Sequence, residues 1–558
     1  MTKIKENIKV LSLEELKNLS KECRDAIISA VSVHGGHLSS NLGVVEATIA
    51  LFKVFDFNKD KIIFDVGHQS YTYKLLTGRS LERLREEDGV AGFPTIEESS
   101  FDCYGTGHSS TSISAAFGFA YARDYKNEQY DVISFIGDAS IVNGVSFEGI
   151  NLLGKSNHKV IIILNDNDMA ISKPVGLIAD QFENNSSATL FHNLGYKVIG
   201  PIDGHNFDEL INAYQTAKES LDSVVIHIKT IKGKGYKYAE KDEVGNWHGV
   251  PKFNVETGEF LANSVTWSDI YSNILFEEMK SDEQIIALVP ATGYGSSMIP
   301  IFESYKNRTI DVGIAEEHAV VSATSLSLSG LKPVVSIYST FLQRTYDQII
   351  HDAARQNADI TFLIDRAGIV GKDGETHQGI FDEAFLTTIP NVVISMASTK
   401  LMAESLFKHS LSRKGPFFIR FPKETYCDLE DNRVYEFGKW VYEIKQNNKT
   451  AIISFGPIIN KVKEFIKDKN VDLINAMYQK PLDLNVVNEI LGYDKIIIYN
   501  PYATKEGFAN SLIAKLIELG YKGEIKILTV PSEYIKHSSI EETLKKYHID
   551  VESLLDII

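Results

Sequence analysis

Two apolar runs that end abruptly in polar residues decide the fold: VISFIGDAS (residues 132–140) and VIIILNDND (residues 160–168). Short β-branched runs with few polar positions are typical of strands that helices cover on both faces. The stretch between them, residues 146–156, is long enough for one crossover helix. We therefore predict two neighbouring strands of a parallel sheet, whose carboxyl ends bring the polar residues to one edge.

The same alternation of apolar runs and helical stretches continues along the chain. The other candidate strands are residues 224–228, 285–289, 334–338, 360–364, 392–395, 417–421, 451–455, 496–499 and 525–530. These strands are too many for one ordinary sheet, so we predict an α/β protein with several mostly parallel sheets flanked by helices. Polar segments at residues 239–263 and 422–438 are predicted linkers. The expected domains are residues 1–262, 263–430 and 431–558.

Composition excludes several classes of protein. The 558 residues carry a net charge of −17, with 44% hydrophobic and 23% charged residues, as folded globular proteins do. The acidic balance argues against a nucleic-acid partner. We find no apolar run long enough to cross a membrane and no signal peptide. Cys23, Cys103 and Cys427 are far apart in the sequence, which excludes the usual zinc spacing and suits a reducing cytoplasm.

The polar ends of the first two strands predict a metal site. Asp138 follows one strand directly, and Asn167 lies just after the other. Carboxylate and amide oxygens are ligands that Mg²⁺ prefers, and phosphate oxygens often complete its octahedron. Gly137 and Gly144 let the backbone approach phosphates closely. The alternative is that Asp138 only caps the following helix and that the second polar run is a solvated turn.

A second candidate site residue is Glu316, in the segment TIDVGIAEEHAVVSATSLSLSG (residues 309–330). This segment predicts a strand, a turn and a helix, with Glu316 at the turn. A carboxyl group in an apolar pocket keeps its proton more readily than in water, and it can hydrogen-bond to an aromatic nitrogen of a ligand. The alternative is an ordinary acidic residue in the first turn of a helix.

The pair of strand ends resembles the thiamine-diphosphate motif, with Ala139 where a glycine is usual. Longer stretches resemble the 1-deoxy-D-xylulose-5-phosphate synthase family of transketolase-like enzymes. They are HGGHLSSNLGVVEATIAL (34–51), DVGHQSYTYKLLTGR (65–79), GTGHSSTSISAAFGFA (105–120), KGKGYKYAEKD (232–242), DVGIAEEHAV (311–320), KPVVSIYSTFLQRTYDQIIHD (332–352) and DRAGIVGKDGETHQGIFDEAF (365–385). The resemblance implies a diphosphate-binding domain, a pyrimidine-binding domain and a C-terminal transketolase-like domain.

The resemblance also implies roles at matching positions. Mg²⁺ would be bound by Asp138, Asn167 and the carbonyl of Met169. Cofactor contacts would come from His68, Gly107, His108, Ser109, Ala139, Ser140, Asn167, Tyr236, Glu316 and Phe341. The catalytic residues would be Glu316, His37, His248 and His377. The acceptor would be held by Tyr338, Arg344, Asp373, His377 and Arg420.

Physical chemistry agrees with several of these roles. Histidines titrate near neutral pH, which suits proton transfer. Arg344 and Arg420 lie near predicted strand ends, and two guanidinium groups can hold one phosphate. For any one of these residues the alternative is a core histidine or a surface ion pair.

The implied reaction is decarboxylation of pyruvate and transfer of its two-carbon unit to D-glyceraldehyde 3-phosphate, with thiamine diphosphate and Mg²⁺ as cofactors. The product would serve isoprenoid synthesis, and also thiamine and pyridoxal synthesis. The resemblance implies a homodimer. Two alternatives stay open, namely a paralogue with another 2-oxo acid or aldehyde and a cofactor-binding protein without turnover. Only sixteen residues separate 176 from 193, where the family usually carries a longer insertion.

Overall fold

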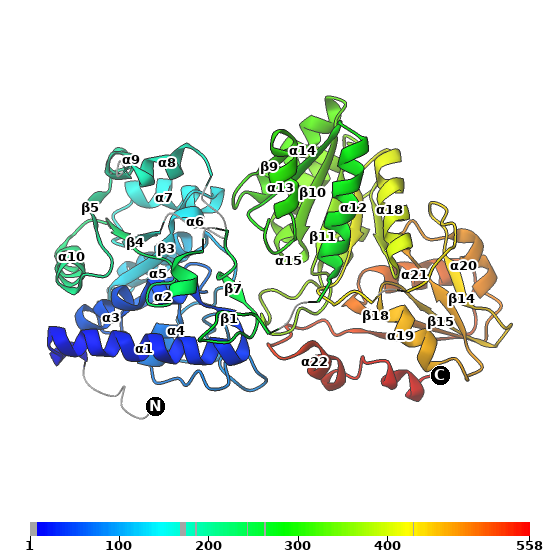
Figure 1. The fold of residues 1–558 in the computed structure, drawn as a ribbon, viewed down its shortest axis with the longest axis horizontal. Helices are drawn as coiled ribbons and strands as arrows, with labels where there is room; N and C mark the ends of the chain where they lie inside the picture. The colour runs from blue at the N-terminus through cyan, green and yellow to red at the C-terminus, as the bar shows by residue number, and fades with distance from the viewer. Residues whose placement is uncertain (1–7, 168–174, 185–186, 243, 262–263, 428) are drawn as a thin grey trace. The chain divides into compact units, whose positions relative to one another are not determined.

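The computed structural model describes residues 8–167, 175–184, 187–242, 244–261, 264–427 and 429–558. The chain forms two compact units. The first contains residues 1–263 together with the short segment 313–315, and the second contains residues 264–312 and 316–558. Each unit is described by itself below, and Figure 1 labels the elements.

A five-stranded parallel sheet forms the centre of the first unit, in the order β2-β3-β4-β6-β5. Its strands are β2 (Lys61–Phe64), β3 (Val132–Gly137), β4 (Ile161–Asp166), β5 (Lys197–Asp203) and β6 (Val224–Lys229). Alternate residues of β3 enter two different hydrophobic clusters, Ile133 and Phe135 in one, Val132 and Ile136 in the other. The sheet is therefore covered on both faces, as predicted from its apolar strands.

Helices and one small sheet complete the first unit. The helices are α1 (Leu13–His34), α2 (Ser39–Gly43), α3 (Val45–Val54), α4 (Tyr71–Leu76), α5 (Ser112–Tyr125), α6 (Asp138–Ile141), α7 (Gly144–Lys155), α8 (Leu177–Glu183), α9 (Ser187–Asn193), α10 (Phe207–Glu219) and α11 (Lys237–Glu240). The small sheet pairs β1 (Gly36–His37) with β7 (Gly249–Val250) in antiparallel fashion. Because β7 lies within the predicted linker 239–263, that segment is in part an ordered piece of the first unit.

The second unit contains two sheets. The seven-stranded sheet has the order β17-β12-β13-β11-β10-β8-β9, and the five-stranded sheet has the order β14-β16-β15-β18-β19. Strands of the first are β8 (Ile285–Val289), β9 (Thr309–Asp311), β10 (Lys332–Tyr338), β11 (Thr361–Asp365), β12 (Val393–Met396), β13 (Phe417–Arg420) and β17 (Tyr478–Lys480). Strands of the second are β14 (Val441–Ile444), β15 (Thr450–Ser454), β16 (Asp472–Asn475), β18 (Lys495–Thr504) and β19 (Glu524–Val530).

Most strand pairs of the second unit are parallel, and helices lie on its sheets (Figure 1). The α-helices are α12 (Trp267–Ser281), α13 (Ile299–Ser304), α14 (Glu316–Leu328), α15 (Ser339–Leu342), α16 (Tyr346–Gln348), α17 (Asp382–Thr387), α18 (Lys400–Ser412), α19 (Ile458–Phe465), α20 (Leu484–Ile490), α21 (Phe508–Glu518) and α22 (Ile540–Lys546). Strand β17 pairs antiparallel with β12 and so forms one edge of the seven-stranded sheet, although the strands before and after it in the chain belong to the five-stranded sheet.

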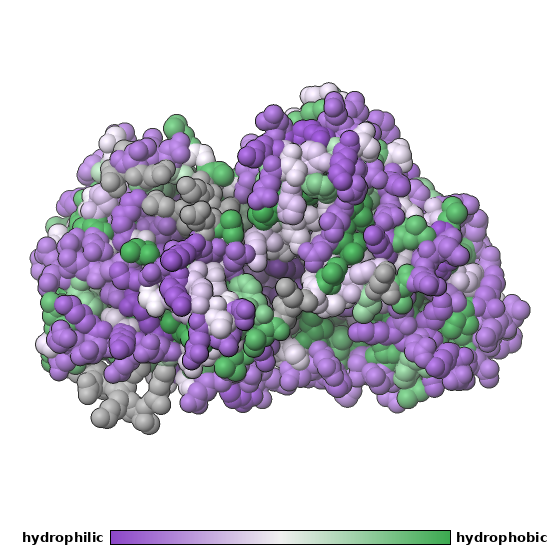
Figure 2. Space-filling model, viewed as in Figure 1, coloured by the Kyte–Doolittle hydropathy of each residue, from purple (hydrophilic) through white to green (hydrophobic). Residues whose placement is uncertain are grey.

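The predicted fold class is confirmed, and all eleven predicted strands are present within a few residues of their expected ends. The three-domain division stays a prediction. Within the part of the chain that the structure describes, no helix combines the length and apolar character that a membrane crossing needs. The face drawn in Figure 2 is mostly hydrophilic, with hydrophobic residues scattered across it.

Candidate active site

Asp138 and Asn167 lie side by side at the carboxyl ends of β3 and β4. The two strands are parallel neighbours, with Gly137 opposite Asn165. The backbone N–H of Asn167 donates to Oδ2 of Asp138 at 3.2 Å, and the N–H of Ala139 donates to Oδ1 at 2.7 Å. The predicted pairing of these two residues at one sheet edge is therefore present.

The electrostatics at Asp138 favour a bound cation. Burial, together with the nearby charge of Asp166, raises the pKa of the Asp138 carboxyl to about 6. Burial also lowers the pKa of Lys232 to about 8, and the charge of Asp138 opposes that shift. A side chain built on Gly137 or Gly144 would meet no described atom within 4 Å. Buried oxygens, a nearby ammonium group and open space beside two glycines fit a Mg²⁺-diphosphate group.

Asp166, which precedes Asn167 in the polar run, has a different role. Oδ2 of Asp166 accepts hydrogen bonds from Nε2 of His227 at 2.6 Å and from Nζ of Lys229 at 2.7 Å. The predicted ligand Met169 lies outside the described residues. Across the described ranges, no three His, Cys, Asp or Glu side chains are grouped as metal ligands. The predicted metal ligands include only one residue of these four types, Asp138.

The loop before α5 carries the predicted cofactor contacts Gly107, His108 and Ser109, and it is tied to the segment that carries Ala139 and Ser140. The hydroxyl of Ser110 donates to the carbonyl of Ser140 at 2.9 Å.

Two further side chains fix this loop. Asp65, at the end of β2, accepts the backbone N–H groups of Ser110 at 2.7 Å and Ser112 at 3.1 Å. The hydroxyl of Ser146 bridges the carbonyls of Ser110 and Ser140. The polar edge of the sheet is thus assembled from three consecutive parallel strands.

Three of the predicted histidines form one cluster in the first unit. The ring centroids of His37 and His68 are 5.6 Å apart, those of His37 and His248 are 5.6 Å apart, and those of His68 and His248 are 5.2 Å apart. The pairing of β1 with β7 brings His37 beside Gly249. The side-chain amide of Asn41 donates to the carbonyls of His37 and His68 at 2.8 and 2.6 Å, which fixes both backbones.

The ionisation of two of these histidines differs from the prediction. Burial, helped by the charge of Lys232, lowers the pKa of His68 to about 3, and burial holds the pKa of His248 well below its usual range. Both imidazoles are therefore neutral at pH 7, rather than titrating near it. Their Nδ1 atoms are buried and lack a hydrogen-bond partner among the described residues. Such atoms are suited to receive polar groups of a ligand.

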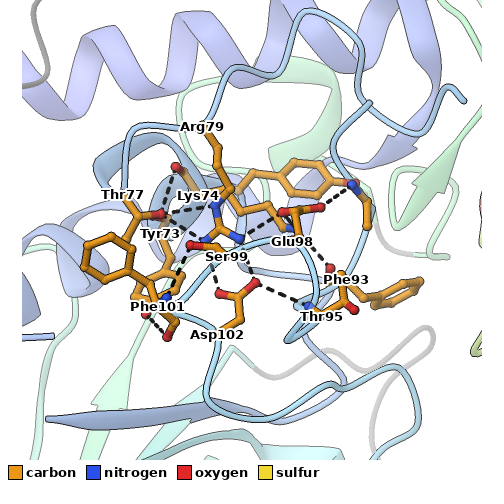
Figure 3. Close-up of polar contacts among 12 residues, drawn as sticks. Tyr73, Lys74, Thr77, Arg79, Phe93, Thr95, Glu98, Ser99, Phe101 and Asp102 are labelled. Carbon is orange, nitrogen blue, oxygen red and sulfur yellow. Dashed lines mark hydrogen bonds and ion pairs between the residues drawn. The ribbon is translucent and has the colours of Figure 1, made fainter. Parts of the chain in front are cut away.

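A buried ionic network, drawn in Figure 3, holds the loop 93–102. Nζ of Lys74 lies 2.5 Å from Oε1 of Glu98 and donates to the carbonyl of Phe93 at 3.0 Å. The guanidinium of Arg79 joins Glu98 at 2.8 Å to Asp102 at 2.6 Å. The ring of Phe93 packs edge-on against His37, with centroids 5.2 Å apart.

Tyr236 does not join this group through its side chain. Its ring packs against Trp247 and Phe253, and its hydroxyl donates to the carbonyl of Val255 at 3.0 Å. The side chain of Tyr236 is engaged by these neighbours, and the predicted contact of Tyr236 with the cofactor stays a prediction. Its apolar neighbours explain this placement, because an aromatic ring next to other rings gains more from packing than from solvent.

In the second unit, Glu316 is the first residue of α14 and is 4% exposed. Burial raises the pKa of its carboxyl to about 7, although the charge of Arg344 acts in the opposite direction. Nη1 of Arg344 lies 3.7 Å from Oε2 of Glu316. That oxygen is buried and accepts no hydrogen bond from the residues that the structure describes. The predicted protonatable carboxyl in an enclosed place is therefore present.

Tyr338, Phe341 and His377 form an aromatic group in the same unit. The rings of Tyr338 and Phe341 are stacked with centroids 5.5 Å apart, and His377 meets Phe341 edge-on at 5.8 Å. The guanidinium carbon of Arg366 lies 3.8 Å from the centre of the Tyr338 ring, and the charge of Asp373 acts on Arg366. These contacts bring together three residues predicted to hold the acceptor, Tyr338, Asp373 and His377.

The surroundings of Arg420 differ from the prediction that it holds the acceptor. Its side chain has no exposed surface, and its guanidinium donates to Asp382 at 2.7 and 2.8 Å and to Glu383 at 3.0 Å. It also donates to the carbonyl of Tyr502 at 3.1 Å. Two carboxylates already neutralise this charge, so Arg420 fastens the start of α17 and is not placed to hold a phosphate beside Arg344.

Sequence reasoning missed Arg366, Lys232, Asn41 and Asp65. All four lie inside the motif stretches quoted above, so the stretches themselves were the available signal. Arg366 is the clearest case. It follows the strand β11 directly and has a positive φ of 61°, a conformation that non-glycine residues rarely adopt outside special sites.

The short segment after residue 176 is filled by two helices. They are α8 (Leu177–Glu183) and α9 (Ser187–Asn193), and the side chains of Phe182 and Phe191 pack face to face with centroids 6.4 Å apart. At the place where the family usually carries a longer insertion, the chain thus forms two short helices that pack on each other through this aromatic contact.

Comparison with known proteins identifies relatives of the whole chain. A family model described as 1-deoxy-D-xylulose-5-phosphate synthase matches residues 1–187 and 180–230, and one described as the pyrimidine-binding domain of transketolase matches residues 263–428. The 1-deoxy-D-xylulose-5-phosphate synthase of Clostridium tetani is 39% identical, over 98% of this chain and 97% of that protein.

Another relative of the same description, from Listeria monocytogenes, is 41% identical over 98% of this chain and 94% of that protein. Among solved structures, transketolase from Campylobacter jejuni aligns with 98% of this chain and 99% of its own, at 16% identity and a TM-score of 0.46. The identity to full-length relatives decides the matter: the chain belongs to the 1-deoxy-D-xylulose-5-phosphate synthase family.

Proposed function

We propose that the protein converts pyruvate and D-glyceraldehyde 3-phosphate into 1-deoxy-D-xylulose 5-phosphate and CO₂, with thiamine diphosphate and Mg²⁺ as cofactors. The product serves non-mevalonate isoprenoid synthesis and the synthesis of thiamine and pyridoxal. The observation that carries the proposal is the adjacency of Asp138 and Asn167 at one strand edge. The buried carboxyl of Glu316 supports it.

In the proposed enzyme, Asp138, Asn167 and the carbonyl of Met169 would hold the metal. The tied loops with Gly107, His108, Ser109, Ala139 and Ser140 would contact the diphosphate, and the ammonium group of Lys232 would offset its charge. The adjacency of the loops through Ser110 and Asp65 supports this assignment. Fixed donors and a metal in a water-poor site cost no reorganisation when the ligand binds.

Thiamine diphosphate, when bound, would supply a carbanion centre and an electron sink for the decarboxylation of pyruvate. Glu316 would hold a proton for an aromatic ring nitrogen of the cofactor, and its pKa of about 7 allows it to keep or release that proton near neutral pH. Phe341 offers a ring face for stacking.

We assign proton handling near the reacting carbons to His37, His248 and His377. The low pKa of His248 means that it acts as a neutral hydrogen-bonding group in the ground state. Tyr338, Arg344, Asp373 and His377 hold the acceptor. We add Arg366 to this set, in place of Arg420, because its charge lies in the group formed by Tyr338 and Asp373.

We also propose that the protein is a homodimer that works in the cytoplasm. The homodimer rests on the family resemblance. The cytoplasmic location is supported by three cysteines that are all free thiols, one of them buried, as expected in a reducing compartment.

Turnover of isotope-labelled substrate tests the proposal. The purified protein is incubated with Mg²⁺, thiamine diphosphate, 1-¹³C-pyruvate and D-glyceraldehyde 3-phosphate. We expect labelled CO₂ and unlabelled 1-deoxy-D-xylulose 5-phosphate in equal amounts, and neither without the cofactor. Tight cofactor binding with no turnover would favour a cofactor-binding protein. Turnover only with a different aldehyde would favour a paralogue.

A further inference from the structure

A cavity lies wholly within the second unit, and its lining residues are remote in sequence from the predicted metal-binding segments. It has a volume of about 1060 Å³. Its walls come from the strap 423–427, from helices α19 and α22, and from Trp267 and Tyr502. None of its lining residues is assigned above to cofactor or acceptor binding. A cavity of this size is at the upper end of the range for small-molecule sites.

Glu424 provides a carboxyl at this cavity. It lines the cavity and is partly buried, and this burial raises its pKa. The opposing charge that acts on it is that of Lys461, which is exposed and forms no ion pair with Glu424 within 4 Å in the described structure. A carboxylate taken out of water without a close counter-charge is costly, and proteins keep such groups mostly where a ligand or proton compensates them.

The backbone of Glu424 is held in place, so its position is not accidental. The carbonyl of Glu424 accepts the N–H of Trp267 at 3.3 Å, and the N–H of Tyr426 donates to the carbonyl of Val265 at 2.8 Å. The neighbouring Lys423 forms an ion pair with Asp373 at 3.2 Å. Lys423, the residue before Glu424, thus connects this wall of the cavity to the loop that carries Asp373.

The walls favour a ligand with an apolar body and a positive charge. Trp267, Tyr502, Ile458 and Leu544 supply apolar and aromatic surface. Acidic residues outnumber lysines five to three in the lining. Two of the three lysines are engaged, Lys423 with Asp373 and Lys545 with Glu541, and two of the five acids are engaged, Glu541 with Lys545 and Glu464 with Lys467. The hydroxyl of Tyr502 accepts the N–H of Ile458 at 2.9 Å, which orients its ring in the wall.

We propose that this cavity binds an amphipathic organic cation of the arylalkylamine type, with its ammonium group on the Glu424 carboxylate and its ring against the aromatic and aliphatic wall. The charge pair gains strength because the carboxylate is partly removed from water. The ring gains hydrophobic contact, and the ammonium group can also use the nearby aromatic faces.

Three probes that share a phenyl ring and a two-carbon chain test the charge requirement. They are 2-phenylethylamine, 2-phenylethanol and 3-phenylpropanoate, measured by calorimetry and saturation-transfer NMR on the protein saturated with Mg²⁺ and thiamine diphosphate. We expect the amine to bind roughly tenfold or more tightly than the alcohol, and the carboxylate not to bind. Equal binding of amine and alcohol, binding of the carboxylate, or no binding of any probe would overturn the proposal.

Variants locate the site. Glu424→Gln keeps the shape of the side chain and should remove the preference for the amine, with alcohol binding unchanged. Glu541→Gln, at a lining carboxylate already paired with Lys545, is the matched control and should leave all three probes unaffected. Leu544→Trp fills the apolar wall and should weaken amine and alcohol together. An amine preference that survives Glu424→Gln would contradict the assignment.

Discussion

The Glu316 carboxyl illustrates how burial prepares a side chain for chemistry. In water a glutamate releases its proton near pH 4.5, whereas burial in this fold raises the pKa of Glu316 to about 7. The opposing charge of Arg344 at 3.7 Å is too distant to cancel that effect. The protonated form is therefore favoured by folding, and the group is divided between its two forms near neutral pH.

This shift has a consequence for stability. Because the folded-state pKa is raised, the stabilising effect of the bound proton is complete below pH 4.5 and is lost as the pH rises through about 7. Without added cofactor, the free energy of unfolding of the parent should fall as the pH rises from 5 to 8, whereas that of Glu316→Gln should not. We therefore expect the stability of Glu316→Gln relative to the parent to increase by about 3 kcal/mol from pH 5 to pH 8. Urea denaturation midpoints at both pH values measure it.

Glu317→Gln is the control for this comparison, since Glu317 is the adjacent acidic residue and is only partly buried. It should show no such divergence from the parent. A parent and a Glu316→Gln variant whose midpoints keep a constant difference across this pH range would show that the Glu316 carboxyl is not held protonated.

Two arginines at the carboxyl ends of buried strands differ in role. Arg420 is neutralised by Asp382 and Glu383, whereas Arg366 lies on the ring of Tyr338. We expect Arg366→Met to raise the KM for D-glyceraldehyde 3-phosphate roughly tenfold or more, with the KM for pyruvate almost unchanged. Steady-state kinetics with each substrate varied in turn measure the split.

Arg420→Met should behave differently. It leaves two buried carboxylates without a counter-charge, which costs about 3–5 kcal/mol and should lower the melting temperature. Thermal unfolding of both arginine variants decides the matter. If Arg420→Met were as stable as the parent and affected only the acceptor KM, the sequence prediction would be right and the structural correction wrong.

At the scale of elements, the network around α4 shows how a loop near the histidine cluster is held. Lys74 is fully buried, and burial lowers its pKa while the charge of Glu98 opposes that shift. The contacts from Lys74 and Arg79 to Glu98 and Asp102 tie the loop 93–102 to α4 and the turn after it (Figure 3). Removing one charged side chain of this network leaves the opposite charge buried without its ion-pair partner.

A double-mutant cycle on Lys74 and Glu98 tests this network. We expect Glu98→Gln alone to cost about 3 kcal/mol of folding free energy, since it strands the Lys74 ammonium group. The pair Lys74→Met with Glu98→Gln should cost less than the sum of the single changes, by about 0.5–3 kcal/mol. Denaturation midpoints give the four values. Simple additivity would mean that the two side chains do not act together.

The elements also show where sequence patterns are informative. Runs such as residues 132–137 and 361–365 are buried on both faces, so an unbroken apolar pattern revealed them. The strand β5 was missed because most of its residues are at least partly exposed and a Gly-Pro pair interrupts it. The strands β9 and β17 have only three residues each, and their pairing depends on partners distant in the chain.

At the scale of the whole molecule, the sequence revealed those parts of the site that strand ends dictate. Asp138 and Asn167 follow neighbouring parallel strands, so their adjacency follows from topology. The histidine cluster was reached only through family resemblance, because it depends on the pairing of residues 36–37 with 249–250. The role of Arg420 could not be predicted, since nothing local shows that Asp382 and Glu383 meet it.

The central claim is that one group of residues binds the metal and diphosphate while Glu316 controls a proton of the same cofactor. Exchange of the C2 proton of thiamine diphosphate for deuterium, followed by acid quench and proton NMR, measures that control directly. We expect the parent to exchange about 10²-fold or more faster than Glu316→Gln, with equal affinity for Mg²⁺ and thiamine diphosphate. Exchange as fast in Glu316→Gln as in the parent would contradict the account.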